Sequence, residues 1–209
     1  DFYGPDKLYR NNRDGTFTNM IEITVPHTPW FSMGTDVADI NNDGLLDLFA
    51  SDMAATTHYK AKVNMGEMDE QSWFLTSANP PQYMANSVYL NSGTDRFFEV
   101  SRLLGLGSTD WTWSVKFADF DNDGWIDLYV TNGMTRNWFN SDMRAQLYKL
   151  GGLNTEKGGQ LVLDAAPLEE PNLVFRNLGH LRFQKPDDSW GLGQVGVSFG
   201  AATGDLDGD

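Results

Sequence analysis

The sequence contains two nine-residue acidic segments, 39–47 and 119–127, in which oxygen-bearing side chains alternate with other residues. Positions 1, 3, 5 and 9 of these segments are Asp39, Asn41, Asp43 and Asp47 in the first, and Asp119, Asp121, Asp123 and Asp127 in the second. Oxygens at alternate positions of a tightly turned loop converge on one point, and a flexible cage of six to eight oxygen ligands suits Ca²⁺ better than Mg²⁺. The two segments therefore predict calcium-binding loops.

Position 6 of both segments is glycine, which permits the sharp turn that such a loop requires. This turn would let the main-chain carbonyl at position 7, from Leu45 or Trp125, point inward as a further ligand. A third segment begins with the same alternation and contains Asp205, Asp207 and Asp209. We expect this third site to be weak, because its positions 6 to 9 are not in the sequence.

Two other interpretations of the acidic segments were weighed. An EF-hand needs a bidentate Glu at position 12 and a helix on each side, whereas position 12 is Ala50 or Val130 here and the flanks are apolar and rich in strand-forming residues. A solvated acidic turn without metal is the second alternative. Four like charges within a few ångströms would repel strongly without a cation, and the motif is repeated, so both points favour metal.

The acidic segments belong to a longer repeat. The motif at 8–11 (Leu-Tyr-Arg-Asn) recurs at 88–91 and 174–177, with offsets of 80 and then 86 residues. The same two offsets separate the first residues of the three acidic segments. Because two separate motifs keep the same spacing, we interpret them as parts of one repeated unit.

Each unit has the pattern of four short strands. A strand pair with an Asp14-Gly15 turn comes first, and two further strands flank each acidic segment. These later strands are expected at 33–38, 47–50, 115–118 and 127–130. Four short strands per repeat are typical of a propeller blade, so the predicted fold is all-β, a partial β-propeller of about three four-stranded blades with helical insertions between blades.

The predicted organisation is a single partial propeller domain over 1–209. Its repeat units are 7–50, 87–130 and 172–209, and its inserts are 51–86 and 131–171. Three blades cannot close a ring that typically needs four to eight, so we expect a fragment of a longer chain. Inserts of this length are usually functional or carry their own structure, and we expect helices at about 143–150 and within 52–63. Aromatic residues in the inserts could cap the blades or form a binding surface.

The motifs also carry a family resemblance. Residues 198–209 resemble the FG-GAP (VCBS-type) repeat of integrin α-subunit propellers. Residues 119–130 and 172–177 are similar to the ASPIC/UnbV group, the bacterial relatives of cartilage acidic protein. The resemblance implies an extracytoplasmic calcium-binding propeller in a secreted, periplasmic or cell-envelope protein. Asn41 and the Met33-Gly34 pair depart from the usual Asp and Phe-Gly of the repeat.

Composition excludes several partners and chemistries. Twenty-nine acidic and 15 basic residues give a formal charge of −14, which argues against nucleic acid or an anionic membrane as partner. No apolar run approaches the roughly 20 residues of a membrane span. The absence of cysteine excludes disulfides and thiolate zinc sites.

Signals for catalysis are few. The three histidines, His27, His58 and His180, are scattered, and no nucleophile elbow or phosphate-binding glycine loop is present. The expected function is therefore recognition of a protein or glycan by a calcium-binding adhesion module, more consistent with a non-enzyme. Two alternatives stay open: a propeller-type polysaccharide lyase with an active site partly outside this sequence, and a structural scaffold of the cell envelope.

Overall fold

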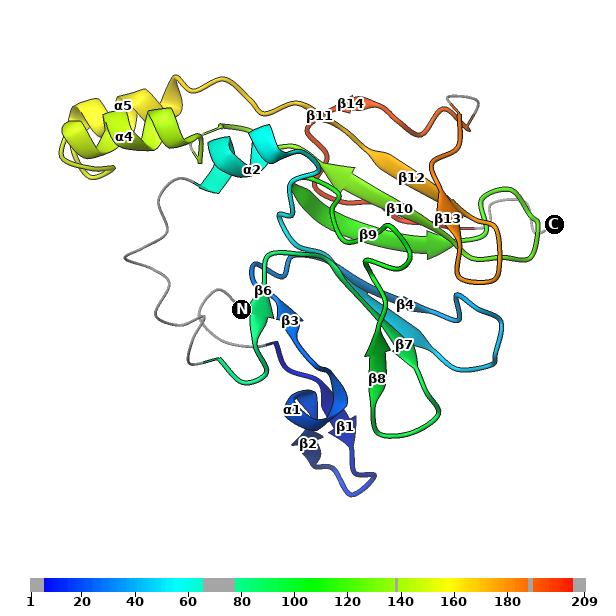
Figure 1. The fold of residues 1–209 in the computed structure, drawn as a ribbon. Coiled ribbons are helices and arrows are strands. Elements are labelled where there is room, and N and C mark those ends of the chain that lie inside the picture. The colour runs from blue at the N-terminus through cyan, green and yellow to red at the C-terminus, as the bar shows by residue number, and fades with distance from the viewer. Residues whose placement is uncertain (1–5, 66–77, 138, 188–189, 205–209) are drawn as a thin grey trace.

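The computed structural model describes residues 6–65, 78–137, 139–187 and 190–204. Within these ranges the protein is mainly β, with two four-stranded antiparallel sheets and three two-stranded sheets. Figure 1 shows the two larger sheets one above the other, with the helices of the inserts gathered beyond one end of the strands. Sheets of four antiparallel strands are what propeller blades are made of.

The two larger sheets have the same order of strands. The first has the order β4-β5-β7-β8 and comprises β4 (Thr35–Ala38), β5 (Asp47–Ala50), β7 (Ser87–Asn91) and β8 (Phe97–Glu99). The second has the order β9-β10-β12-β13 and comprises β9 (Thr112–Ala118), β10 (Asp127–Asn132), β12 (Leu173–Asn177) and β13 (Phe183–Gln184). The strands expected around the acidic segments are thus present.

The sheets are out of phase with the sequence repeat. Each sheet takes two strands from one unit and its outer hairpin from the next, because β5 pairs with β7 and β10 pairs with β12. The hairpin of the first unit, β1 (Tyr9–Asn11) and β2 (Phe17–Asn19), forms a small sheet of its own. Three units therefore give two four-stranded sheets within the described ranges, where about three blades were expected.

The first insert contains α2 (His58–Met65), and the second contains α4 (Ser141–Lys149) and α5 (Glu156–Leu163). The helix expected from about residue 143 is present but begins earlier, because the Asn140 side chain caps it by accepting the N–H groups of Asp142 and Met143. The sequence analysis did not foresee α5 or the single-turn α1 (Ile21–Thr24).

Both inserts lie at the same end of the sheets, where α2 is next to α4. Lys60 of α2 fixes this arrangement, with its Nζ 2.7 Å from Asp110 Oδ2 and 2.9 Å from Glu170 Oε1. Two short pairs lie nearby: β3 (Thr28–Pro29) with β6 (Gln82–Tyr83), and β11 (Glu170–Pro171) with β14 (Val195–Gly196). The charged groups of this cluster are paired with one another, which favours a structural role.

The largest core cluster draws on both four-stranded sheets. Phe49 of β5 meets Phe117 of β9 edge to face, with ring centroids 6.2 Å apart. The innermost strands approach so closely that a Cβ at Gly34 would lie 2.7 Å from the Trp113 carbonyl oxygen, so this position needs glycine. The fully or nearly fully buried members are Ile40, Phe49, Val88, Leu104, Leu106, Val115, Phe117, Leu128, Val130 and Phe175.

Candidate metal loops

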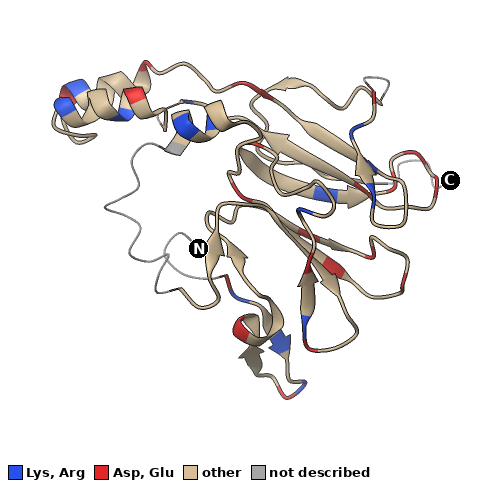
Figure 2. Ribbon diagram, viewed as in Figure 1, with Lys and Arg blue, Asp and Glu red and all other residues tan. Residues whose placement is uncertain are grey.

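The acidic segments are strand–loop–strand connections, as predicted. Residues 39–47 join β4 to β5, and residues 119–127 join β9 to β10. Both loops lie at the end of the sheets opposite the helical inserts (Figure 1), and acidic residues mark both turns in Figure 2. The two faces of the molecule are therefore distinct, one carrying the acidic loops and the other the inserts.

The backbones of the two loops bend in the same way. Gly44 and Gly124 at position 6 both have φ +85°, the left-handed conformation that glycine adopts without penalty. Position 4 is also left-handed, with φ 58° at Asn42 and 56° at Asn122. Asparagine is among the few other residues that tolerate this conformation. The role of the glycines was predictable from the sequence, whereas that of the asparagines was not predicted.

Hydrogen bonds within the second loop turn its carboxylates inward. Asp119 Oδ1 accepts the N–H of Asp123 at 3.1 Å, and Asp119 Oδ2 accepts the N–H of Gly124 at 2.7 Å. Asp123 Oδ1 in turn accepts the N–H of Trp125 at 2.9 Å. The backbone N–H groups thus hold the carboxylates at positions 1 and 5 on the inside of the turn.

The first loop repeats this frame. Asp39 accepts the N–H groups of Asp43 and Gly44 at the same two distances, 3.1 and 2.7 Å. At position 3 the Asn41 side chain accepts the N–H of Asp43 at 3.1 Å and donates from Nδ2 to Asp43 Oδ2 at 2.9 Å. An amide can therefore replace the carboxylate at position 3 without changing the course of the loop.

The carboxylate at position 9 is buried and anchors each loop to the hairpin of the next unit. Asp127 Oδ1 accepts the N–H of Asn177 at 2.7 Å, and its Oδ2 accepts the N–H of Phe120 at 3.0 Å. Asp47 Oδ1 accepts the N–H of Asn91 at 2.8 Å in the equivalent way. Burial raises the pKa of both carboxyls despite these hydrogen bonds, because the charged form loses its water.

Two asparagines that were not predicted as site residues, Asn177 and Asn42, link the two loops. Asn177 Nδ2 donates to the Ile126 carbonyl of the second loop at 3.0 Å and to the Ile40 carbonyl of the first loop at 2.8 Å. Asn42 Nδ2 forms a further link to the Gly124 carbonyl at 3.1 Å. For Asn177 the available signal was the repeated motif at 88–91 and 174–177, whose last residue is asparagine in both copies.

The second loop brings together a group of carboxylates that fits a cation. Oxygens of Asp119, Asp121 and Asp127 lie within 4.8 Å of one another. Asp121 Oδ1 is buried and has no hydrogen-bond partner among the described residues, so it has a free acceptor. An all-oxygen donor set of this kind is what a hard divalent cation requires.

The remaining predicted ligands divide into two groups. Leu45 and Trp125 occupy position 7 of their loops, and their side chains pack on glycines of the neighbouring hairpins. If Gly93 had a Cβ atom, it would lie 3.5 Å from Leu45 Cδ1. A Cβ atom at Gly179 would lie 2.7 Å from Trp125 Cζ2. The inward direction of their carbonyls stays a prediction. The third segment, with Asp205, Asp207 and Asp209, lies outside the described residues.

An arginine that the sequence analysis did not single out contacts the second loop. Arg176 of β12 places Nε 2.7 Å from Asp121 Oδ2 and Nη2 2.9 Å from Asp123 Oδ2. The hydrogen bond to Asp123 is the main reason that the pKa of Arg176 is raised above its already high value. The second loop is thus partly neutralised by a cation of the protein itself.

The histidines do not converge on one site. His58 begins α2 at the surface, and His180 lies exposed in a hairpin turn with φ 53°, as expected for a solvated turn residue. His27 lines a pocket of about 320 Å³ together with Tyr83, Ser101 and Arg102, and its Nε2 lies 3.5 Å from Glu99 Oε2. This pair belongs to β8 and to the segment before β3, and it includes none of the acidic-loop residues.

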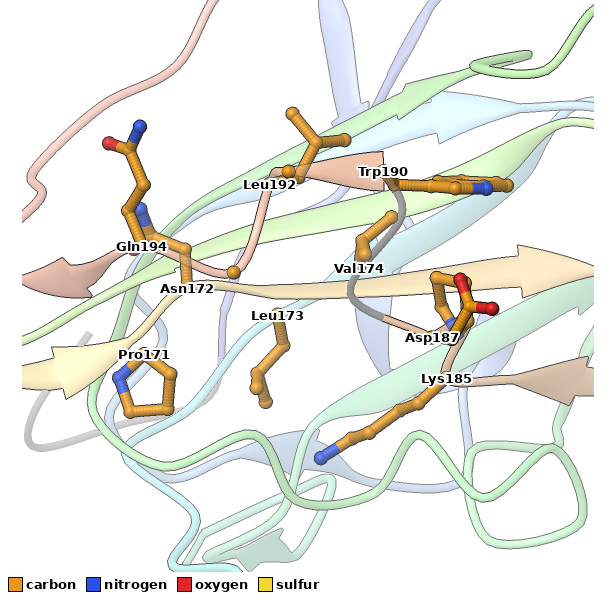
Figure 3. A pocket seen from close by; sticks show the side chains of 12 residues that line it. Pro171, Asn172, Leu173, Val174, Lys185, Asp187, Trp190, Leu192 and Gln194 are labelled. Carbon is orange, nitrogen blue, oxygen red and sulfur yellow. The ribbon is translucent and has the colours of Figure 1, made fainter.

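A larger pocket of about 480 Å³ lies beside β12. Figure 3 shows it between residues 171–174 and the segment that carries Trp190, Leu192 and Gln194. Its charged lining residues are Lys185 and Asp187, and Lys185 Nζ lies 5.5 Å from the centroid of the Phe175 ring. The rest of the lining is largely apolar, so this pocket does not offer a set of metal ligands.

The fold and the loops define a protein built from β repeats, each with an acidic strand–loop–strand turn. The family model of the FG-GAP-like repeat matches residues 1–50 and 74–130, more than half of the chain. The protein therefore belongs to the FG-GAP-like repeat family. A search of curated proteins found no match. Within the ranges described, no helix has the length and apolar character needed to cross a membrane.

Proposed function

We propose that this protein is a calcium-binding β-propeller module that recognises a protein or glycan outside the cytoplasm. The observation that carries the proposal is the carboxylate group of Asp119, Asp121 and Asp127, placed in a loop whose backbone is repeated by the first loop. FG-GAP repeats are often calcium-binding recognition modules, and the family match supports this assignment.

Calcium would act as a structural staple in each loop. It would neutralise carboxylates that otherwise repel one another and that burial already disfavours, as at Asp47 and Asp127. The chain itself supplies the frame, because backbone N–H groups already hold the position 1 and position 9 carboxylates. The energetic benefit of binding is then added to the folded state alone.

The staple can be tested by thermal unfolding with and without calcium. A ligand at about 100 times its Kd stabilises the folded state by roughly 2.7 kcal/mol, so calcium should raise the Tm by several degrees. Asp121→Asn should remove part of this rise, since Asp121 offers a free oxygen to the loop. Asp164→Asn is the matched control, because that carboxylate is exposed on the insert and accepts only from Gln160 among its described partners. Equal melting curves with calcium and with chelator would contradict the proposal.

The recognition surface is assigned to the insert end of the molecule. The inserts leave equivalent points of the two sheets, and they expose aromatic rings there, with Tyr59 75% and Tyr148 87% exposed. Exposed aromatic side chains supply much of the contact energy in protein and glycan recognition. The acidic loops at the opposite end are then structural.

Binding can be located by comparing the two ends. Tyr59→Ser with Tyr148→Ser should abolish binding to ligands found on a glycan array or by extracellular-protein pull-down, while Asp142→Asn on the same helix as Tyr148 should leave binding intact. The exposed Tyr9, at 59%, provides a control far from the inserts. Loss of binding with Tyr9→Ser and not with the insert variant would place the surface elsewhere.

A further inference from the structure

We propose that Arg176 is a built-in counter-cation of the second loop, which lowers the calcium affinity of that loop by competing for its carboxylates. This inference rests on the proposed calcium binding and goes beyond it, because it assigns a regulatory role to a residue that is not a metal ligand. Its outcome can be separated from that of the calcium proposal, as set out below.

Arg176 contacts two carboxylates of the second loop. Arg176 lies on β12, the strand that follows the second insert, and its guanidinium reaches the loop between β9 and β10. The guanidinium contacts one oxygen of each of two carboxylates, Oδ2 of Asp121 and Oδ2 of Asp123. The other oxygen of Asp121 is buried and has no hydrogen-bond partner in the part of the chain that the structure describes. The guanidinium thus touches two predicted ligands and leaves at least one ligating oxygen.

The two loops differ in their carboxylates. Position 3 is Asn41 in the first loop and Asp121 in the second, so the loops contain three and four carboxylates. The residue equivalent to Arg176, 86 positions earlier in the repeat, is Leu90. The second loop has the additional carboxylate, Asp121, and the guanidinium of Arg176 on β12 contacts that carboxylate. Both loops therefore carry the same net charge of −3.

A divalent cation bound by Asp119, Asp121 and Asp127 would lie within a few ångströms of the guanidinium, and like charges repel. The Arg176 side chain is 41% exposed, so water screens much of this repulsion. A repulsion of this kind reduces affinity on the order of tenfold. Without metal, the same guanidinium offsets one of the four negative charges of the loop and pairs with Asp121 and Asp123.

The experiment measures calcium affinity of the second loop alone. Asp39→Asn with Asp43→Asn in the first loop provides the background, and calcium is titrated by calorimetry. In this background Arg176→Leu should tighten binding about tenfold, and Arg176→Gln, which keeps a polar side chain with an NH₂ donor but removes the charge, should tighten it similarly. Arg136→Leu is the matched control, since Arg136 is exposed and donates to the Thr135 carbonyl.

A second measurement keeps the inference falsifiable if a variant is poorly folded. Terbium bound in the second loop should be sensitised by Trp125. Displacement of terbium by calcium then gives the calcium affinity of this loop from the loss of terbium luminescence, a signal that only correctly folded loops produce. Far-UV circular dichroism of Arg176→Gln, compared with that of the parent, verifies its fold. Adding Asp121→Asn to Arg176→Leu should return the affinity close to the parent value, because charge is then matched again.

The outcomes are distinct. Tighter binding in both Arg176 variants, reversed by Asp121→Asn, supports the counter-cation role. Unchanged or weaker binding overturns it, since the arginine would then be neutral or would help to orient the ligands. Failure of the parent protein to bind calcium or terbium at all would overturn the proposed function and, with it, this inference.

Discussion

At the scale of single residues, the protein resolves the conflict between burial and hydrogen bonding differently at different carboxyls. Asp52 is fully buried and accepts the N–H groups of Trp30 and Phe31, yet loss of water prevails and raises the pKa of Asp52 to about 6. Burial also acts on Glu99, but there the hydrogen bonds prevail, from His27 and Ser101 among others, and hold the pKa of Glu99 at about 2. Both carboxyls accept several hydrogen bonds, so the deeper burial of Asp52 is what separates them.

Glu99 gives a prediction for acid stability. Its pKa is lowered in the folded state, from 4.5 to about 2, so its contribution is fully present above pH 4.5 and is lost as the pH falls towards 2. The shift corresponds to about 3 kcal/mol. Glu99→Gln should lower the free energy of unfolding at pH 7 by up to this amount and should flatten its decline between pH 4.5 and 2. Urea unfolding of both proteins in calcium-free buffer across that range measures this, and parallel curves would contradict it.

At the scale of elements, the sequence predicted strands and loops well because their signals are local. The Asp-Gly and Asn-Asp-Gly turns fix the hairpins and the metal loops through left-handed residues such as Gly44, and the flanking strands follow from them. The assignment of each outer hairpin to the sheet of the preceding repeat unit could not be predicted from such local signals. It depends on β5 pairing with β7 across the whole first insert, a contact between residues such as Leu48 and Tyr89 that no local pattern encodes.

The same distinction applies to the candidate site. The ligands at positions 1, 3, 5 and 9 were predictable, since they lie within nine residues of one another. Arg176 and Asn177 reach the second loop from about 50 residues away in the sequence. Their roles follow from the pairing of β10 with β12, which sets the hairpin beside the loop. The repeated motif singled out the position of Asn177, but it did not indicate that Asn177 contacts the acidic loop.

At the scale of the whole molecule, the two sheets are joined at the metal-loop end by few but specific contacts. Asn177 belongs to the second sheet, yet it donates to the Ile40 carbonyl in the first loop. Asp36 of β4 accepts the N–H of Phe117 in β9 at 2.9 Å, which ties the innermost strands together. Binding at one loop therefore orders groups that also hold the other loop, and the two sites should be coupled.

This coupling leads to a prediction for Asn177. Asn177→Ala removes the donor shared by the two loops and leaves the Ile40 and Ile126 carbonyls without it, so the coupling of calcium binding at the two loops should weaken, with the link from Asn42 to Gly124 left in place. Asn91→Ala is the matched control, because Asn91 holds the same repeat position but its Nδ2 donates to Leu46 of the first loop alone. Coupling between sites is typically 5- to 150-fold in affinity, about 1–3 kcal/mol, and two-site calorimetric titration resolves it. Equal coupling in the Asn177 and Asn91 variants would show that the loops communicate by another route, with the hydrogen bond from Asn42 to the Gly124 carbonyl as the next candidate.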